Sequence, residues 1–275
     1  MTFSIAAIVL FAALLHASWN ALLKGGSDRL WSMTVMGIAT SITCGALVAF
    51  LPMPLRPSWP YLIGSAILHI GYNIFLIRAY RSGEFGSAYP IARGSSPLLV
   101  TLGAATVAGE SPSLSGIAGI LLVSAGIISL AFRGKRLPET GIFYALGTGM
   151  FIAAYSVADG IGGRLSGAPV AYTLWMCLMW GLTAAPVYWL RRRDNHLWRG
   201  ARATSLAALG GVVSLLAYGI VIFAMTLAPM GSVSALRETS VLFAVLLGRV
   251  FFAEPLTPRR IISALVIAAG ALCLE

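Results

Sequence analysis

The chain contains ten apolar stretches that are each long enough to cross a lipid bilayer as a helix. A spanning helix needs about 20 mostly apolar residues. The stretches are 3–22, 32–51, 59–79, 86–107, 113–132, 140–158, 168–190, 204–226, 231–252 and 257–274. No stretch alternates apolar and polar residues as a strand would, and open sheet edges cannot face lipid. We therefore predict an all-α integral membrane protein with ten transmembrane helices.

The composition fits this interpretation and argues against a soluble protein. Of the 275 residues, 58% are hydrophobic and 10% are charged, whereas soluble domains carry about 25% charged residues. The formal net charge of +10 does not indicate nucleic-acid binding, because the basic residues lie mainly in loops, where water and lipid headgroups are their partners. The first stretch lacks a basic start and a cleavage site, so we expect a retained helix rather than a signal peptide.

The basic residues are distributed unevenly between the two sets of loops. With ten spans, 14 of the 19 Lys and Arg residues fall on the side of the first loop, 2 fall on the other side, and 3 lie within spans. Cytoplasmic loops carry the basic excess. We therefore expect a bacterial inner membrane protein with both chain ends in the periplasm.

The two halves of the chain resemble each other when the sequence is shifted by 144 positions. Arg93 then aligns with Arg237, and Glu110 with Glu254, and there are ten identities between Arg93 and Leu130. Each half holds five spans, and five is odd, so the second half must enter the membrane upside down. We predict two inverted five-helix units, residues 1–137 and 138–275.

The ends of the fourth and ninth spans resemble a known repeat. The segments are Gly109-Glu110-Ser111-Pro112-Ser113 and Ala253-Glu254-Pro255-Leu256-Thr257, and Trp19-Asn20 in the first span also fits the pattern. These features are similar to the EamA repeat of the drug/metabolite transporter superfamily. The resemblance implies ten helices, a central cavity between the halves and alternating access. The YddG type of aromatic amino-acid exporter is the branch that we take as its neighbour.

Charge within a span is costly by about 2.5–3.5 kcal/mol per residue at the helix centre. The intramembrane charged residues that we take as site candidates are Arg93, Arg237 and Glu238. The inverted repeat predicts Arg93 and Arg237 near opposite membrane faces, where each would bind carboxylates or control a gate. The alternatives are snorkelling and a structural ion pair. Arg237 and Glu238 need not be partners, because neighbours on a helix point about 100° apart.

The start of the fourth span contains residues that disturb a helix. Pro90, Gly94 and Pro97 lie within one short segment, and proline removes helical hydrogen bonds. Freed carbonyls inside a bilayer need protein or water partners. The segment therefore predicts a broken helix that acts as a hinge and lines a cavity, with a simple kink as the alternative.

A His-aromatic-Asn pattern occurs twice, at positions i, i+3 and i+4 of the first and third spans. Its members are His16, Trp19, Asn20, His69, Tyr72 and Asn73. Such spacing places the three side chains on one helix face. These faces can contact substrate or can fix helix packing through interhelical hydrogen bonds. Further candidates to line a cavity are Tyr80, Tyr89, Tyr155 and Tyr218.

No catalytic or cofactor motif is found in the sequence. It has no phosphate-binding glycine loop, and its three cysteines are far apart, without metal-ligand spacing. We expect no enzyme activity, no cofactor and no metal, and a monomer whose partners are lipids and a small-molecule substrate. The leading hypothesis is a secondary transporter that exports small metabolites, aromatic or apolar amino acids above all. The alternatives are efflux of lipophilic organic cations and, in a different class, a membrane enzyme or lipid flippase.

Overall fold

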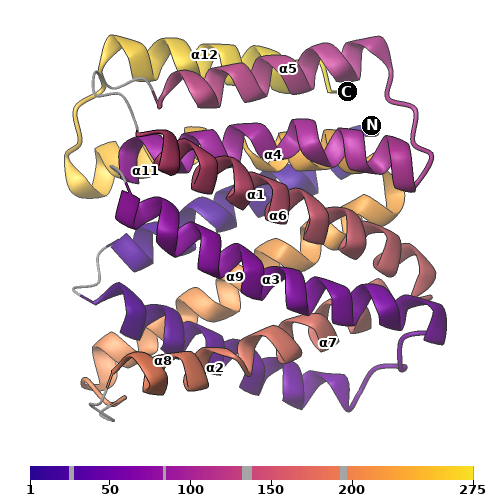
Figure 1. Cartoon of the computed structure of the whole chain (residues 1–275), viewed down its shortest axis with the longest axis vertical. Helices are drawn as coiled ribbons and strands as arrows, with labels where there is room; N and C mark the ends of the chain where they lie inside the picture. Colours follow the sequence, from indigo (N-terminus) through magenta and orange to yellow (C-terminus); the bar gives the residue numbers. More distant parts are fainter. Residues whose placement is uncertain (25–27, 83–84, 132–137, 193–196, 275) are drawn as a thin grey trace.

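The computed structural model describes residues 1–24, 28–82, 85–131, 138–192 and 197–274, and this part of the chain is helical without strands (Figure 1). The elements are α1 (Phe3–Lys24), α2 (Arg29–Val48), the 3-10 helix η1 (Arg56–Ser58), α3 (Trp59–Ser82), α4 (Phe85–Val107), α5 (Leu114–Ser129), α6 (Glu139–Leu165), α7 (Pro169–Gly181), α8 (Ala184–Arg191), α9 (Ala201–Leu227), α10 (Met230–Arg237), α11 (Ser240–Phe252) and α12 (Pro258–Leu272). The predicted all-α class is confirmed.

Two of the ten predicted stretches are interrupted in the structure. Residues 168–190 form α7 and α8, and residues 231–252 form α10 and α11. Among the described residues, five helices are long and apolar enough to span a membrane: α1, α2, η1 with α3, α6 and α9. The predicted sixth stretch ended too early, because α6 continues to Leu165. The number of ten spans stays a prediction.

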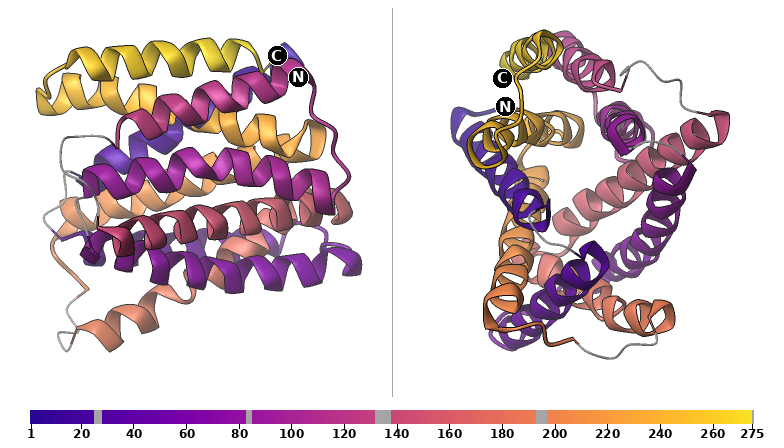
Figure 2. Two further views of the ribbon diagram at one scale, coloured as in Figure 1. Left: turned by 45° about the horizontal axis from the view of Figure 1, so that its top comes forward. Right: turned by 90° about the vertical axis from the view of Figure 1, so that its left-hand side faces the viewer.

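The helices lie side by side, so that their ends form two opposite faces of the bundle (Figures 1 and 2). In its middle, α3 packs on α6, α1 packs on α9, and α4 packs on α6. The helices α5 and α12 form a pair at one edge of the bundle (Figure 1). The labelled chain ends lie close together (Figure 1).

Glycines allow α5 and α12 to approach each other closely. A Cβ atom on Gly126 would lie 2.7 Å from Cγ1 of Ile267, and one on Gly270 would lie 2.8 Å from the backbone nitrogen of Val123. The Ser129 and Ser263 hydroxyls meet at 2.7 Å across the same contact. Small residues at these two positions therefore serve close helix packing.

We predict that Gly126→Leu reduces the yield of folded, monodisperse protein. The leucine must displace Ile267 or separate the two helices, and overpacking of this kind costs about 1–3 kcal/mol. Size-exclusion chromatography and thermal melting measure the effect. Gly64→Leu is the matched control, because a Cβ atom there meets nothing within 4 Å. An equal loss in both variants would contradict this interpretation.

Asp28 holds together the loops at one end of the bundle. Its carboxylate lies 2.7 Å from Arg192 and 2.9 Å from Arg199, and it accepts the backbone N–H of Trp31 at the start of α2. Burial alone would raise the pKa of Asp28. The Trp31 hydrogen bond and the two arginines outweigh burial and hold the pKa below its ordinary value of 3.8.

This depressed pKa predicts a pH dependence of stability. The ionised carboxylate stabilises the folded state above about pH 4, and the contribution is lost as the pH falls through the lowered folded-state pKa. We expect Asp28→Asn to lower the melting temperature by about 2–4 °C near neutral pH, as a change of about 1 kcal/mol would. The wild-type and Asp28→Asn melting temperatures should converge below about pH 3. A difference that does not depend on pH would exclude the ion pairs as its cause.

Candidate functional site

The interruption between α10 and α11 places two charged residues inside the bundle. Arg237 ends α10, Glu238 is its C-cap, and α11 begins at Ser240. The Arg237 and Glu238 side chains are buried, with no exposure at all for Glu238. A break in a membrane helix is tolerated where protein surrounds it, and all eight residues of α10 are buried.

Glu238 is the centre of a buried ion network. Arg93 Nε lies 2.9 Å from one carboxylate oxygen, and Arg237 Nη2 lies 3.1 Å from the other. Nη2 of Arg93 also lies 3.1 Å from Nε2 of His16 on α1. Two guanidinium groups thus surround one carboxylate. Because arginine stays protonated, the network carries one positive charge that Glu238 does not balance.

This geometry corrects one prediction. Arg93 and Arg237 do not lie near opposite membrane faces, since both contact Glu238. Each lies about 10–12 Å along its helix from the helix start, at 1.5 Å per residue, so residues that enter from opposite sides meet near the middle. The sequence left open whether Arg237 and Glu238 are partners, and in the structure they are paired at 3.1 Å.

Aromatic rings lie beside the network. The His69 ring stacks on Tyr155 with centroids 4.0 Å apart, and the Tyr72 ring meets the edge of Tyr155 at 5.8 Å. The Tyr218 ring lies 6.2 Å from that of Tyr155. The guanidinium of Arg93 lies 5.8 Å from the Tyr89 ring centroid, within the range of a cation–π contact. Four of the predicted cavity residues, His69, Tyr72, Tyr155 and Tyr218, therefore form one aromatic cluster.

The remaining predicted cavity residues have no described contact with Arg93, Arg237 or Glu238. Trp19 meets the edge of the His16 ring at 5.0 Å, and Asn20 donates to the His16 backbone carbonyl within α1. Asn73 is half-buried on α3. The side chain of Tyr80 lies outside what the structure describes.

The predicted break in the fourth span is wrong. Pro90, Gly94 and Pro97 all lie inside the continuous helix α4. Gly94 serves packing instead, since a Cβ atom there would lie 2.5 Å from Cγ1 of Ile128. The break occurs in the ninth stretch, which contains no proline between its ends.

Two hollows in the described surface lie away from the network. One of about 770 Å³ is lined by residues 53–63 around η1, and one of about 270 Å³ lies between α4 and α5. Neither is lined by a residue of the ion network. The low exposure of Arg93 (7%) and Arg237 (3%) shows that this conformation closes the network off from water.

Residues 139–274 match the model of the EamA-like transporter family. This match supports a membrane transporter that is similar to members of that family. A solved crystal structure has a TM-score of 0.76 and 23% sequence identity, with 99% of this chain and 96% of that chain covered. That likeness shows a shared fold. A search of curated proteins found no match to the chain.

The segment that matches the family contributes only part of the network. Arg237 and Glu238 lie within this segment, whereas His16 and Arg93 come from the preceding half of the chain. The site is therefore built between the two halves. Within the described residues, no group of three or more His, Cys, Asp and Glu side chains is arranged to hold a metal.

One buried acidic residue between positions 139 and 274 was not predicted as a site residue. Asp159 has no exposed surface and accepts hydrogen bonds from the hydroxyls of Tyr172 (3.0 Å) and Tyr218 (2.5 Å). The predicted sixth span ended at residue 158, which assigned Asp159 to a loop. The sequence did contain one indication of its role. Tyr155 and Asp159 are four positions apart, so they would share a face of a helix that continued past residue 158.

We predict that Arg93 has a role that depends on its charge. Arg93→Gln should lower transport by about tenfold or more, whereas Arg93→Lys should keep part of the activity, since lysine retains the charge but not the planar fork that reaches His16 and Glu238 together. Melting curves should show folded protein for both variants. Arg249→Gln is the matched control, because Arg249 is exposed on α11. Full activity of Arg93→Gln would exclude the role.

Proposed function

We propose that the chain is a secondary transporter that exports amino acids with aromatic or apolar side chains, by alternating access between two inverted halves. The observation that carries the proposal is the buried surplus of positive charge around Glu238. A substrate carboxylate can balance this charge, and charge-assisted hydrogen bonds to arginine are strong and directional. The rings of His69, Tyr72 and Tyr155 offer an apolar surface for the side chain of the substrate.

The helix packing supports two related halves. If the halves are exchanged, the contact of α3 with α6 corresponds to that of α9 with α1, and both occur. The contact of α4 with α6 likewise corresponds to that of α11 with α1. Two further contacts join a helix to its counterpart in the other half, so the exchange leaves them unchanged. They are α5 with α12 and α2 with α7. Residues 1–137 and 138–275 are thus our proposed repeats.

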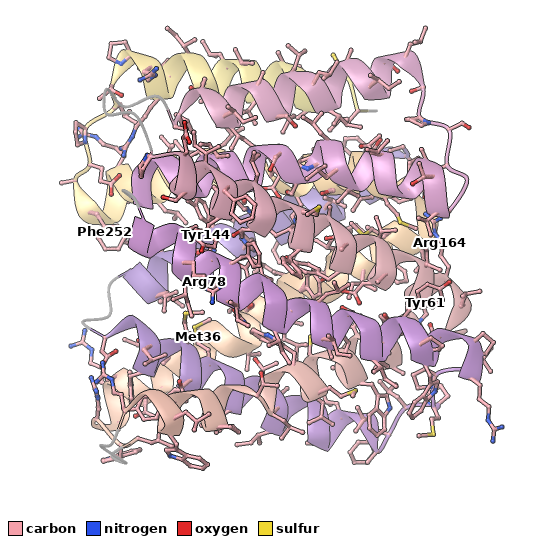
Figure 3. All side chains as sticks on the ribbon, in the orientation of Figure 1. Met36, Tyr61, Arg78, Tyr144, Arg164 and Phe252 are labelled. Carbon is pink, nitrogen blue, oxygen red and sulfur yellow. The ribbon has the colours of Figure 1, made fainter. Side chains whose placement is uncertain are left out.

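The orientation that we propose places the chain ends in the periplasm of a bacterial inner membrane. Arg164 and Phe252 lie at opposite ends of the helices (Figure 3), in accordance with their assignment to opposite membrane faces. Alkaline phosphatase fused after Glu275 should be active, and green fluorescent protein at the same place should be dark. The reverse pattern would overturn the orientation.

Efflux of organic cations is the alternative within transport. Both oxygens of Glu238 already face arginines, so a cation at this carboxylate would have to compete with two fixed positive charges. The geometry therefore favours a substrate with an anionic group. Transport assays in liposomes that compare tryptophan with a cationic dye separate the two, and transport of the dye alone would favour the alternative.

We predict that Trp19→Ala and Tyr72→Ala weaken transport of aromatic substrates more than that of small ones. Lost ring contacts are worth about 0.5–1.5 kcal/mol per aromatic pair, and only an aromatic substrate makes them. Competition of tryptophan and alanine against labelled tryptophan measures the difference. An equal loss for both substrates, with a lower melting temperature, would assign these residues to helix packing.

A further inference from the structure

The bundle contains a second buried carboxylate whose surroundings differ from those of Glu238. Asp159 on α6 has no exposed surface, and its partners are the hydroxyls of Tyr172 on α7 and Tyr218 on α9. Among the described residues, no Lys, Arg or His side chain lies within ion-pair distance of Asp159. Glu238, in contrast, has two arginines. Glu238 therefore has more positive than negative charge around it, whereas Asp159 has no positive group beside it.

An ionised Asp159 would carry a negative charge that nothing beside it compensates. Hydroxyl groups satisfy the carboxylate oxygens but bring no charge, and an uncompensated ion in the membrane interior is costly. A positive charge must therefore accompany the ionised form, or the group must hold a proton. A metal ion fits poorly, because both tyrosines direct hydrogens at the carboxylate, whereas a hard cation needs several oxygen lone pairs.

Groups able to pass a proton lie next to Asp159. The Ser65 hydroxyl on α3 faces the carboxylate and lies 3.4 Å from Nδ1 of His69. The His69 ring in turn stacks on Tyr155, which borders the ion network. Cys177 on α7 is the other titratable group that faces this region. A line of polar groups thus runs from Asp159 toward the proposed substrate site.

We propose that Asp159 binds and releases one proton in each transport cycle, so that export is coupled to proton uptake. In the cycle, the carboxylate takes a proton from water on one side of the membrane and releases it to water on the other side. A zwitterionic substrate brings an ammonium group into the same bundle, and a protonated Asp159 no longer offers the negative charge that would balance it. Substrate and proton therefore exclude each other. This inference rests on the proposed export of amino acids.

Proteoliposomes loaded with tryptophan test the coupling. In the wild type, acidifying the outside should accelerate tryptophan efflux by about tenfold, within the usual range of coupling between two sites. Asp159→Asn cannot exchange a proton, so it should lose this acceleration. Because asparagine also lacks the negative charge that balances the substrate ammonium, the variant should exchange internal for external tryptophan at equal pH more slowly than the wild type. Glu139→Gln is the matched control, since it changes an exposed carboxylate at the start of the same helix, and it should behave as the wild type.

The possible results separate this inference from the proposed function. Tryptophan exchange without acceleration in the wild type would overturn the coupling and leave the transporter intact. Acceleration that persists in Asp159→Asn would remove Asp159 from the coupling. No exchange of tryptophan in the wild type would refute the proposed function itself.

A second variant keeps the test decisive if Asp159→Asn does not fold. Tyr218→Phe retains the carboxylate and removes one of the two tyrosine hydroxyls that donate to it, which favours the protonated form. The acceleration should persist with its midpoint moved to higher pH. An unchanged midpoint would overturn the assignment of Asp159 as the proton site.

Discussion

The free-energy cost of burying charge constrains how the helices inside this bundle are arranged. Removing one partner from a buried ion pair costs about 3–5 kcal/mol, because the remaining charge has no compensation. Arg93, Arg237 and Glu238 come from α4 and from the break after α10, and His16 comes from α1. Their contacts therefore fix the relative positions of three segments that are far apart in the sequence.

The turn after α10 keeps a helical backbone. Glu238 (φ −67°, ψ −14°) and Thr239 (φ −58°, ψ −12°) both have right-handed helical dihedral angles. Consecutive side chains of such a backbone leave it in different directions, so the long Arg237 side chain has to bend to meet Glu238 at 3.1 Å. The backbone N–H of Glu238 still bonds to the carbonyls of Ser234 and Ala235. The turn thus keeps its backbone hydrogen bonds, and the length of the arginine side chain brings the two charges together.

The sequence predicted features that depend on composition and spacing, but not those that depend on tertiary contacts. Apolar runs located the helices. Helix spacing joined Trp19 to His16. The convergence of Arg93 and Arg237 on Glu238 could not be predicted, because it depends on how α4 and α10 pack against each other. Pro90 and Pro97 were misleading, since α4 is continuous through both prolines and Gly94 between them packs closely on Ile128 of α5.

Glu110 connects one end of the bundle to this interior. Its carboxylate accepts the backbone N–H of Met230 at the start of α10 and pairs with Arg164 of α6, which also donates to the carbonyls of Met225 and Ala228 at the end of α9. An anion at a helix start is favourable. Because α10 has only eight residues, a displacement at Met230 must reach Arg237 about 10 Å away. In the alternating access that we propose, opening this end would break the Glu110 contacts, and the same movement would shift the charges that surround Glu238.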